Sequence, residues 1–277
     1  MPLTSDSITS DHTSYAEALM ALAWKNAPNQ AEIVRLGAIP PPVSLLRYGD
    51  TLTKRVTAEA LRNLASSSNR DQMVQNDAIP ALITVLQQEH DPAAIGFATW
   101  TLGELSKENG GAIFPLLVNL LRHNDGVITP SAAHVFASLA SPASSYQSAI
   151  VRVGAIPLLV GLLKSARDDA THAAATLTLA RLAAKVPENR VLIAQEGAIP
   201  LFVGLLKKDG THGNTQRDVA KALATVAWST SANQYQIARL GGVSLLVGLL
   251  RAGNAETKPF AALATDKLTD GNPAIQT

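Results

Sequence analysis

The stretch GAIPLLVGLLKS (Gly154 to Ser165) returns almost unchanged as GAIPLFVGLLKK (Gly197 to Lys208), 43 residues further along the chain. The 277 residues contain four more copies of this motif. They are GAIPPPVSLLRY from Gly37, DAIPALITVLQQ from Asp77, GAIFPLLVNLLR from Gly111 (with one residue inserted) and GGVSLLVGLLRA from Gly241.

The six copies recur at a nearly constant interval. The positions equivalent to the motif proline are 40, 80, 115, 157, 200 and 244, so the spacings are 40, 35, 42, 43 and 44 residues. A period near 42 is typical of stacked repeats, because a single repeat cannot bury its apolar face alone. The motif therefore recurs because each copy belongs to one unit of a stacked array.

Each unit is predicted to contain three helices. A short amphipathic segment such as NRVLIAQE (189–196) precedes the motif. The motif glycine suits a left-handed helix end, and the proline suits the first turn of the next helix. The following LLVGLL is apolar nearly all round, as expected for a helix buried between neighbours. After a polar turn comes a longer helical pattern such as DDATHAAATLTLARLAAK (168–185). The predicted fold is all-α, a right-handed α-solenoid.

The complete pattern resembles a known repeat family. N-x-x-x-I-x-x-x-GAIP-x-LV-x-LL, followed by a helix that ends in ALRNLA (Ala60 to Ala65), resembles the armadillo repeat in the GAIPxLVxLL form of plant and protist proteins. The resemblance covers residues 14–270 and implies a single array of about six units, the first and last incomplete. Ser14 and Glu17 fit a capping box, so residues 1–13 are expected to be a polar tail. Residues 271–277 are expected to be a C-terminal tail.

One spacing departs from the period. Only NGGAIFP separates the helix that ends in TLGELSKE from the next motif, where the interval between Pro80 and Pro115 shortens to 35 residues. The short first helix is therefore predicted to be missing there. We expect a local change of superhelical twist within residues 107–112.

Composition narrows the classes of function. Lys and Arg number 23 against 22 acidic residues, a formal charge of +1, so nucleic acid is not an expected partner. The chain has no cysteine, which excludes disulfides, zinc–thiolate sites and thiol nucleophiles. No apolar run approaches the ~20 residues of a membrane-spanning helix, and the polar N-terminus is not a secretory signal. We expect a cytoplasmic protein, with the nucleus as an alternative.

The resemblance implies that the third helices line a concave groove. Family members that hold extended peptides use a ladder of Asn there, with a Trp one turn earlier. The Asn position in this chain is occupied by Ala21, Asn63, Glu104, Ser138, Arg181, Thr225 and Lys267. The Trp position is occupied by Glu17, Glu59, Trp100, His134, Leu177, Lys221 and Leu263. One Asn and one Trp remain, in different repeats, so the peptide-clamping mechanism is not carried over.

The same positions predict a groove with opposite charge at its two ends. Acidic residues stand in the N-terminal half (Glu17, Glu59, Glu104) and basic residues in the C-terminal half (Arg181, Arg217, Lys221, Lys267). We expect a protein segment to bind with its basic residues toward the N-terminal repeats. The candidate groove residues are Glu59, Asn63, Trp100, Glu104, His134, Ser138, Arg181, Arg217, Lys221, Thr225 and Trp228.

The tryptophans allow two interpretations, whereas the histidines show no pattern of a catalytic or metal site. Trp100 is either an anchor in the groove or a core residue. Trp24 and Trp228 hold equivalent positions and are expected to fill the junction with the next unit, with a groove role for Trp228 as the alternative. The six histidines form neither HExxH nor any paired metal spacing. No catalytic residue, metal or cofactor is predicted.

Two functions from different classes follow. The first is a non-enzymatic scaffold that binds a partner segment in the groove. The alternative is a structural array that associates with itself through uncapped terminal repeats. On that alternative, Ala18, Leu19 and Leu22 are left without a preceding repeat and form an exposed apolar surface.

Overall fold

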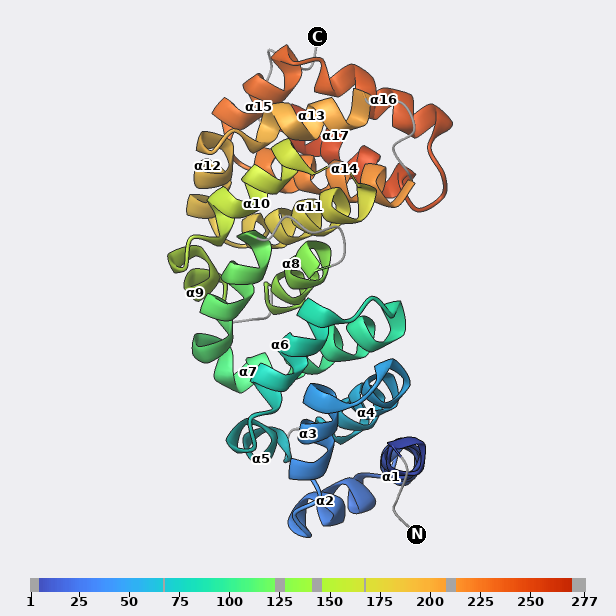
Figure 1. The fold of residues 1–277 in the computed structure, drawn as a ribbon. Coiled ribbons are helices and arrows are strands. Elements are labelled where there is room, and N and C mark those ends of the chain that lie inside the picture. Colours follow the sequence, from blue (N-terminus) through green and yellow to red (C-terminus); the bar gives the residue numbers. More distant parts are fainter. Residues whose placement is uncertain are drawn as a thin grey trace. The chain divides into compact units, whose positions relative to one another are not determined.

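The computed structural model describes residues 5–66, 68–122, 128–140, 146–166, 168–207 and 213–270. These residues form helices joined by turns, with no strand among them (Figure 1). The chain divides into two compact units, Met1–Leu116 and Leu117–Thr277. The sequence predicts a single array over residues 14–270, and the bounds of that array stay a prediction. Each unit is described by itself below.

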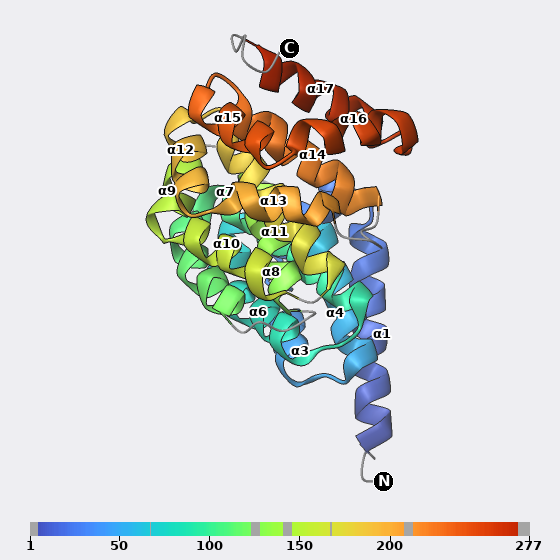
Figure 2. The ribbon, with the colours of Figure 1, turned by 90° about the horizontal axis from the view of Figure 1, so that it is seen from above.

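The first unit holds six helices and the start of a seventh among its described residues. Their bounds are α1 Ser5–Ala23, α2 Ala27–Arg35, α3 Pro40–Tyr48, α4 Thr51–Leu64, α5 Arg70–Gln75, α6 Ala78–Gln88 and α7 Pro92–Arg122. In Figure 2, α1 lies alongside α4, and α3 packs against both α4 and α6.

The second unit continues from the end of α7. Its helices are α8 Ile128–Leu139, α9 Gln147–Arg152, α10 Ala155–Ser165, α11 Asp169–Ala183, α12 Pro187–Gln195, α13 Ala198–Lys207, α14 Gly213–Ala227, α15 Ser231–Arg239, α16 Gly242–Ala252 and α17 Lys258–Thr269. Helices α8, α11, α14 and α17 pack side by side, and so do α10, α13 and α16.

The predicted three-helix unit is confirmed. The first helices are α2, α5, α9, α12 and α15; the second helices are α3, α6, α10, α13 and α16; the third helices are α1, α4, α8, α11, α14, α17 and residues 92–106 of α7. The motif glycine takes the left-handed conformation between first and second helices, with φ of 76° at Gly154. Asp77 holds the same position with φ of 60°, a conformation that Asp tolerates better than most residues.

The missing first helix is also confirmed. Helix α7 runs without a break through the residues that link one third helix to the next second helix, and it carries Pro115 in its interior. The side chains of residues 107–112 lie outside the described part of the chain.

The start of α1 differs from the prediction. The helix begins at Ser5, so Ser14 lies in its interior rather than at its cap, and the helix extends into the expected polar tail. A contact to the neighbouring helix accompanies this extension, because the Thr13 and Thr53 hydroxyls lie 2.7 Å apart. Residues 271–277 lie outside the described residues.

Small aliphatic side chains form most of the buried interior, as the composition predicts. Phe136 and Phe202 are fully buried in the second unit, and Leu61 and Leu82 in the first. One ion pair is buried with them. The Lys54 ammonium lies 2.8 Å from the Glu89 carboxylate, and both side chains are about 90% buried (10% and 8% exposed). This ion pair links α4 to the C-terminal end of α6.

Candidate functional site

The third helices of the first unit enclose a surface hollow. Its volume is about 630 Å³, and its lining comes from α1, α4 and the first turns of α7. Side chains three and four residues apart share one face of a helix, so each helix contributes a short row. The lining residues are Glu17, Met20, Ala21, Arg55, Val56, Glu59, Ala93 and Phe97.

Two carboxylates in this hollow have no cationic partner among the described residues. Glu17 is exposed and Glu59 is half-buried, and neither forms an ion pair within the part of the chain that the structure describes. Arg55, the basic residue of the lining, lies 3.9 Å from Asp91 instead. The floor beside the carboxylates is apolar, formed by Val56 and Phe97 among others. The hollow therefore offers negative charge over an apolar base.

One arginine lies close to three aromatic rings, of which Phe97 also lines the hollow. The guanidinium of Arg62 on α4 lies 5.3 Å from the ring of Phe97, 5.7 Å from Trp100 and 5.9 Å from Trp24. Such cation–π contacts contribute about 0.5–1 kcal/mol each at exposed sites. Trp24 and Trp100 remain 49% and 48% exposed. Trp100 is therefore a surface residue, and Trp24 lies at the junction between repeats without being buried there.

Glu104 does not contribute to this acidic surface. Its carboxylate lies 2.9 Å from the Arg70 guanidinium on α5, and both side chains are mostly buried (17% and 12% exposed). The prediction that Glu104 presents a charge to a partner is wrong. Its charge is neutralised by the neighbouring helix.

Four of the predicted groove residues form hydrogen bonds to main-chain carbonyls. They are Asn63, His134, Ser138 and Thr225. The Asn63 amide donates to the Met20 carbonyl at 3.2 Å. His134 Nδ1 donates to the Pro130 carbonyl, and the Ser138 hydroxyl donates to the His134 carbonyl. The Thr225 hydroxyl donates to carbonyls of its own helix. Their role in binding a partner stays a prediction.

The second unit holds a partly buried group of cations. Arg181 on α11 donates to the Ala137 carbonyl at 2.6 Å. Lys221 on α14 lies with its ammonium 5.8 Å from the Phe260 ring. Burial lowers the pKa of both side chains, and the charge of Arg181 lowers the pKa of Lys221 further. Asp218, which is 5% exposed, acts in the opposite direction on both.

The other predicted cations are paired. Arg217 lies 3.0 Å from Asp218 and 3.1 Å from Glu256, and hydrogen bonding to Asp218 raises its pKa. Lys267 lies 2.9 Å from Asp266, which raises its pKa. Among the four cations predicted for this half, Arg181 and Lys221 are the ones without an ion pair in the described residues.

Trp228 repeats the arrangement around Trp24. Its ring lies 4.9 Å from the Arg190 guanidinium and 5.9 Å from the Lys267 ammonium, and 44% of it is exposed. It lies at the junction between repeats, as expected, but it is not buried there. The indole lies near cations of a first helix and a third helix and remains partly exposed to solvent.

Leu19 differs from the expected self-association surface. It is 6% exposed and belongs to the core, so the prediction that it is left uncovered is wrong. Ala18 and Leu22 are exposed, Leu22 by 53%. The core of the first unit covers Leu19 without a preceding repeat, whereas Ala18 and Leu22 face solvent.

Sequence reasoning missed a set of polar residues on the first helices. The Asn69 amide donates to the Leu64 and Gln30 carbonyls, and the Asn233 amide donates to the Val226 and Arg190 carbonyls. Each reaches the end of a third helix and a neighbouring first helix. The signal was the Asn of the N-x-x-x-I pattern, to which no role had been assigned.

Neither a metal centre nor a membrane span is found in the described ranges. No group of three or more His, Asp or Glu there could hold a metal ion. No single described helix is both long and apolar enough to cross a membrane, and α12 and α13 reach that composition only together, across a 74° bend.

Comparison with known proteins decides the type of repeat. Residues 26–66 match the Armadillo/beta-catenin-like repeat. The fold is that of armadillo repeat solenoids. Two engineered proteins of known crystal structure are 27% identical to this chain. One has a TM-score of 0.67 over 84% of this chain and 97% of its own. The other has a TM-score of 0.71 over 94% and 65%.

A designed armadillo repeat protein shares the fold at lower identity. It is 18% identical, with a TM-score of 0.54 over 97% of this chain and 96% of its own. No curated protein sequence matches the chain. Armadillo repeats generally serve as protein-binding scaffolds and are typically non-enzymatic.

Proposed function

We propose that this armadillo repeat chain is a non-enzymatic scaffold of the cytosol or nucleus that binds an extended segment of a partner protein on its third helices. The observation that carries the proposal is the hollow on α1, α4 and α7, where Glu17 and Glu59 have no cationic partner in the described residues. A surface that carries unpaired carboxylates over an apolar floor is complementary to a side chain that is both long and cationic.

A lysine or arginine of the partner fits this hollow. Its aliphatic stem would lie on Val56 and Phe97, and its charged group would reach the carboxylates of Glu17 and Glu59. Such charge complementarity accelerates association and fixes the direction of the segment more than it raises affinity.

The exposed tryptophans beside the hollow would contact an apolar residue of the same segment. Trp24 and Trp100 are each about half exposed, and Arg62 holds both rings. Tryptophan and arginine are over-represented among residues that dominate binding energy. The partner segment is therefore expected to combine basic and apolar residues.

Arg181 and Lys221 in the second unit would bind acidic residues of the partner. Burial disfavours the charged forms of both side chains and lowers their pKa values, and the charge of Arg181 lowers the pKa of Lys221 further. A carboxylate from the partner would compensate these charges and form charge-assisted hydrogen bonds. Glu104, Arg217 and Lys267 are not part of this proposal, because each already has an opposite charge beside it.

Fluorescence anisotropy with two labelled peptides tests the proposal. One peptide alternates Lys and Leu, and the other carries Glu in place of every Lys. The Lys peptide is expected to lose about tenfold in affinity when Glu17→Gln and Glu59→Gln are combined, because a hydrogen bond to a charged group contributes about 1.5–3 kcal/mol. Glu32→Gln, on an exposed carboxylate that already pairs with Arg35, is the matched control.

The second set of cations has its own test. Lys221→Gln is expected to weaken the Glu peptide and leave the Lys peptide unchanged, whereas Lys185→Gln, at an exposed position, changes neither. Equal binding of both peptides to all variants would refute the proposed recognition by charge on the third helices.

A further inference from the structure

Three cations of the second unit surround one buried carboxylate. Asp218 on α14 is 5% exposed, and its carboxylate lies 3.0 Å from the Arg217 guanidinium. The charge of Asp218 also acts on Arg181 of α11 and on Lys221 of α14, where it opposes the fall in pKa that burial causes. The charges of Arg181 and Arg217 in turn act on Lys221. These groups therefore form one cluster, and we call Arg181, Arg217 and Lys221 around Asp218 the cation cluster.

The cation cluster carries an excess of two positive charges. Arg181 and Lys221 form no ion pair among the described residues, whereas Arg217 is paired with Asp218. Glu256 on α17 lies 3.1 Å from Arg217, but 67% of its side chain is exposed, so solvent screens much of its charge. A ligand with two negative charges would compensate the excess, and a single carboxylate would compensate about half of it.

The hydrogen-bond donors of the cluster come from two neighbouring helices. Helices α11 and α14 pack side by side, and each supplies one cation without an ion pair in the described residues. The Arg181 guanidinium uses Nη1 for the Ala137 carbonyl, which leaves its other N–H donors for a ligand. The Lys221 ammonium lies 5.8 Å from the Phe260 ring and has no hydrogen-bond acceptor in the described part of the chain. A ligand that binds both cations therefore needs acceptor atoms for donors on two helices.

We propose that the cation cluster binds a phosphoryl group on the partner segment, carried by a phosphorylated serine or threonine. This inference rests on the proposed binding of that segment to the third helices, and it names the acidic residue that the segment presents to the second unit. A phosphoryl group carries a charge of about −1.5 to −2 at pH 7 and three acceptor oxygens. Arg181 would bind two of these oxygens through parallel N–H donors, and Lys221 would bind the third. Phosphorylation of the partner would therefore strengthen its binding.

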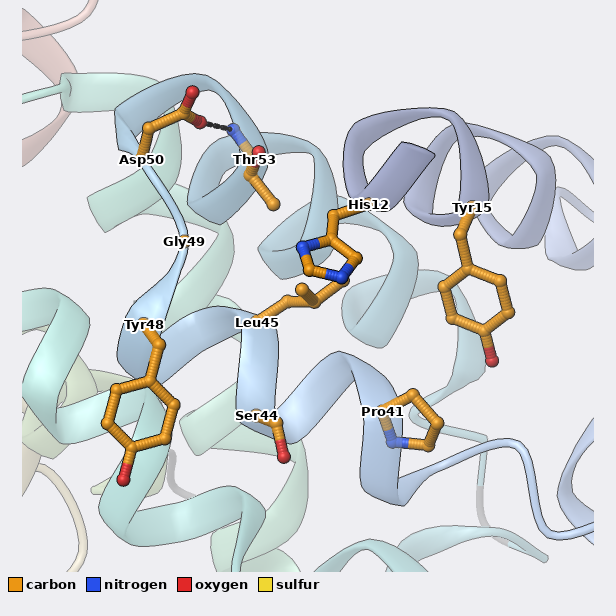
Figure 3. A pocket seen from close by; sticks show the side chains of 9 residues that line it. All are labelled: His12, Tyr15, Pro41, Ser44, Leu45, Tyr48, Gly49, Asp50 and Thr53. Atoms are coloured by element: carbon orange, nitrogen blue, oxygen red, sulfur yellow. Dashed lines mark hydrogen bonds between the residues drawn. The ribbon is translucent and has the colours of Figure 1, made fainter. Parts of the chain in front are cut away.

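A pocket in the first unit lacks the charge for such a ligand (Figure 3). It has a volume of about 520 Å³, and His12 and Tyr15 extend into it from α1. Its wall is mainly apolar, and no Lys or Arg is among the described residues that line it. Its carboxylate, Asp50, accepts a hydrogen bond from the Thr53 amide at 2.7 Å. This pocket therefore does not suit a phosphoryl group.

Fluorescence anisotropy with variants of the peptide that alternates Glu and Leu tests the inference. Three peptides differ at one central position, which carries Glu, Ser or phosphoserine. A fourth keeps the central Glu and adds one Glu at its end, so that its net charge is close to that of the phosphoserine peptide. We expect the phosphoserine peptide to bind about tenfold more tightly than the Glu peptide, because it adds hydrogen bonds to charged donors. The fourth peptide should bind like the Glu peptide, because its extra charge lies outside the cluster.

Variants of the chain assign this gain to the cation cluster. Lys221→Gln should reduce the preference for phosphoserine over Glu to about threefold or less, because it removes one charge-assisted hydrogen bond. Arg181→Lys should do the same, because it keeps the charge and loses the parallel donors. Arg239→Gln, at an exposed position on α15, is the control that removes a charge elsewhere in the second unit and should leave the preference unchanged. Circular dichroism establishes that each variant is folded, and the comparison of peptides on the wild type needs no variant.

The outcomes separate this inference from the proposed function. Equal affinity for the phosphoserine and Glu peptides, with both weakened by Lys221→Gln, would overturn the phosphoryl ligand and leave recognition of an acidic segment in place. Binding of neither peptide would overturn both. An equal gain for the charge-matched peptide would overturn the inference, because net charge alone would explain it. Displacement of the phosphoserine peptide by an equal concentration of inorganic phosphate would do so too, because the site would then bind a free anion.

Discussion

Three exposed glycines are expected to weaken the second unit, and replacing them with alanine should stabilise it. Gly161, Gly204 and Gly248 lie inside α10, α13 and α16 at aligned positions, and all are exposed. A Cβ added at any of them meets no atom within 4 Å. Glycine inside a helix is less favourable than alanine by about 0.5–1 kcal/mol, mainly because a glycine loses more conformational freedom of its backbone when the chain folds.

The size of the effect follows from these three sites. The added methyl groups touch nothing, so their contributions should add, giving about 1.5–3 kcal/mol for the triple variant. In a protein of this size each kcal/mol raises the melting temperature by about 2–4 °C. Urea unfolding followed by circular dichroism, with the m-value checked for constancy, measures the change.

Gly242 is the internal control because alanine cannot fit there. A Cβ on Gly242 would lie 2.6 Å from the Ile237 side chain and 3.0 Å from its carbonyl oxygen, so Gly242→Ala should destabilise. The reasoning is refuted if the triple variant is no more stable than the wild type. It is equally refuted if Gly242→Ala stabilises the chain as much as a substitution at an open site.

Three further predictions concern buried and capping groups. Lys54→Met should destabilise by about 3 kcal/mol, because it leaves Glu89 charged and unpaired in the interior, and adding Glu89→Leu should recover most of that loss in urea unfolding. Asn233→Ala should cost about 2 kcal/mol in the same assay, because two buried carbonyls lose their donor. Asp50 caps α4 through the Thr53 amide, and this hydrogen bond lowers the pKa of Asp50. The stabilisation from this hydrogen bond is complete above the ordinary Asp pKa of about 3.9. It is lost as the pH falls through the lower pKa that Asp50 has in the folded chain. Asp50→Ser should remove that part of the acid dependence of stability.

The repeat period and motif chemistry predicted most of the fold. The left-handed glycines, the three-helix unit and the first helix missing before Pro115 depend on local sequence, and all are found. The start of α1 was not predicted, because the polar residues from Ser5 onward carry little helical periodicity, and the capping box at Ser14 was the stronger local signal.

The candidate site was predicted less well for a physical reason. Alignment of repeats identifies which face a residue lies on, but long charged side chains reach groups in the next repeat. Glu104 meets Arg70, 34 residues away, and Arg217 meets Glu256, 39 residues away. Aligned positions cannot reveal such pairs. Several charges were therefore predicted to be free to bind a partner although the folded chain neutralises them. Glu59 and Lys221 form no ion pair among the described residues, although the charge of Asp218 acts on Lys221, and their contact with a partner stays a prediction.

The polar side chains of the first helices bear on how such an array gains or loses repeats. Gln147 donates to the carbonyls of Ala140 and Arg181, and Arg190 donates to those of Ala183 and Trp228, so each spans two successive third helices. The acceptors are main-chain oxygens, which every amino acid supplies. A repeat can therefore be duplicated, deleted or given new surface residues without losing its partners at the junction. These junction contacts therefore allow the binding surface and the number of repeats to change independently of each other.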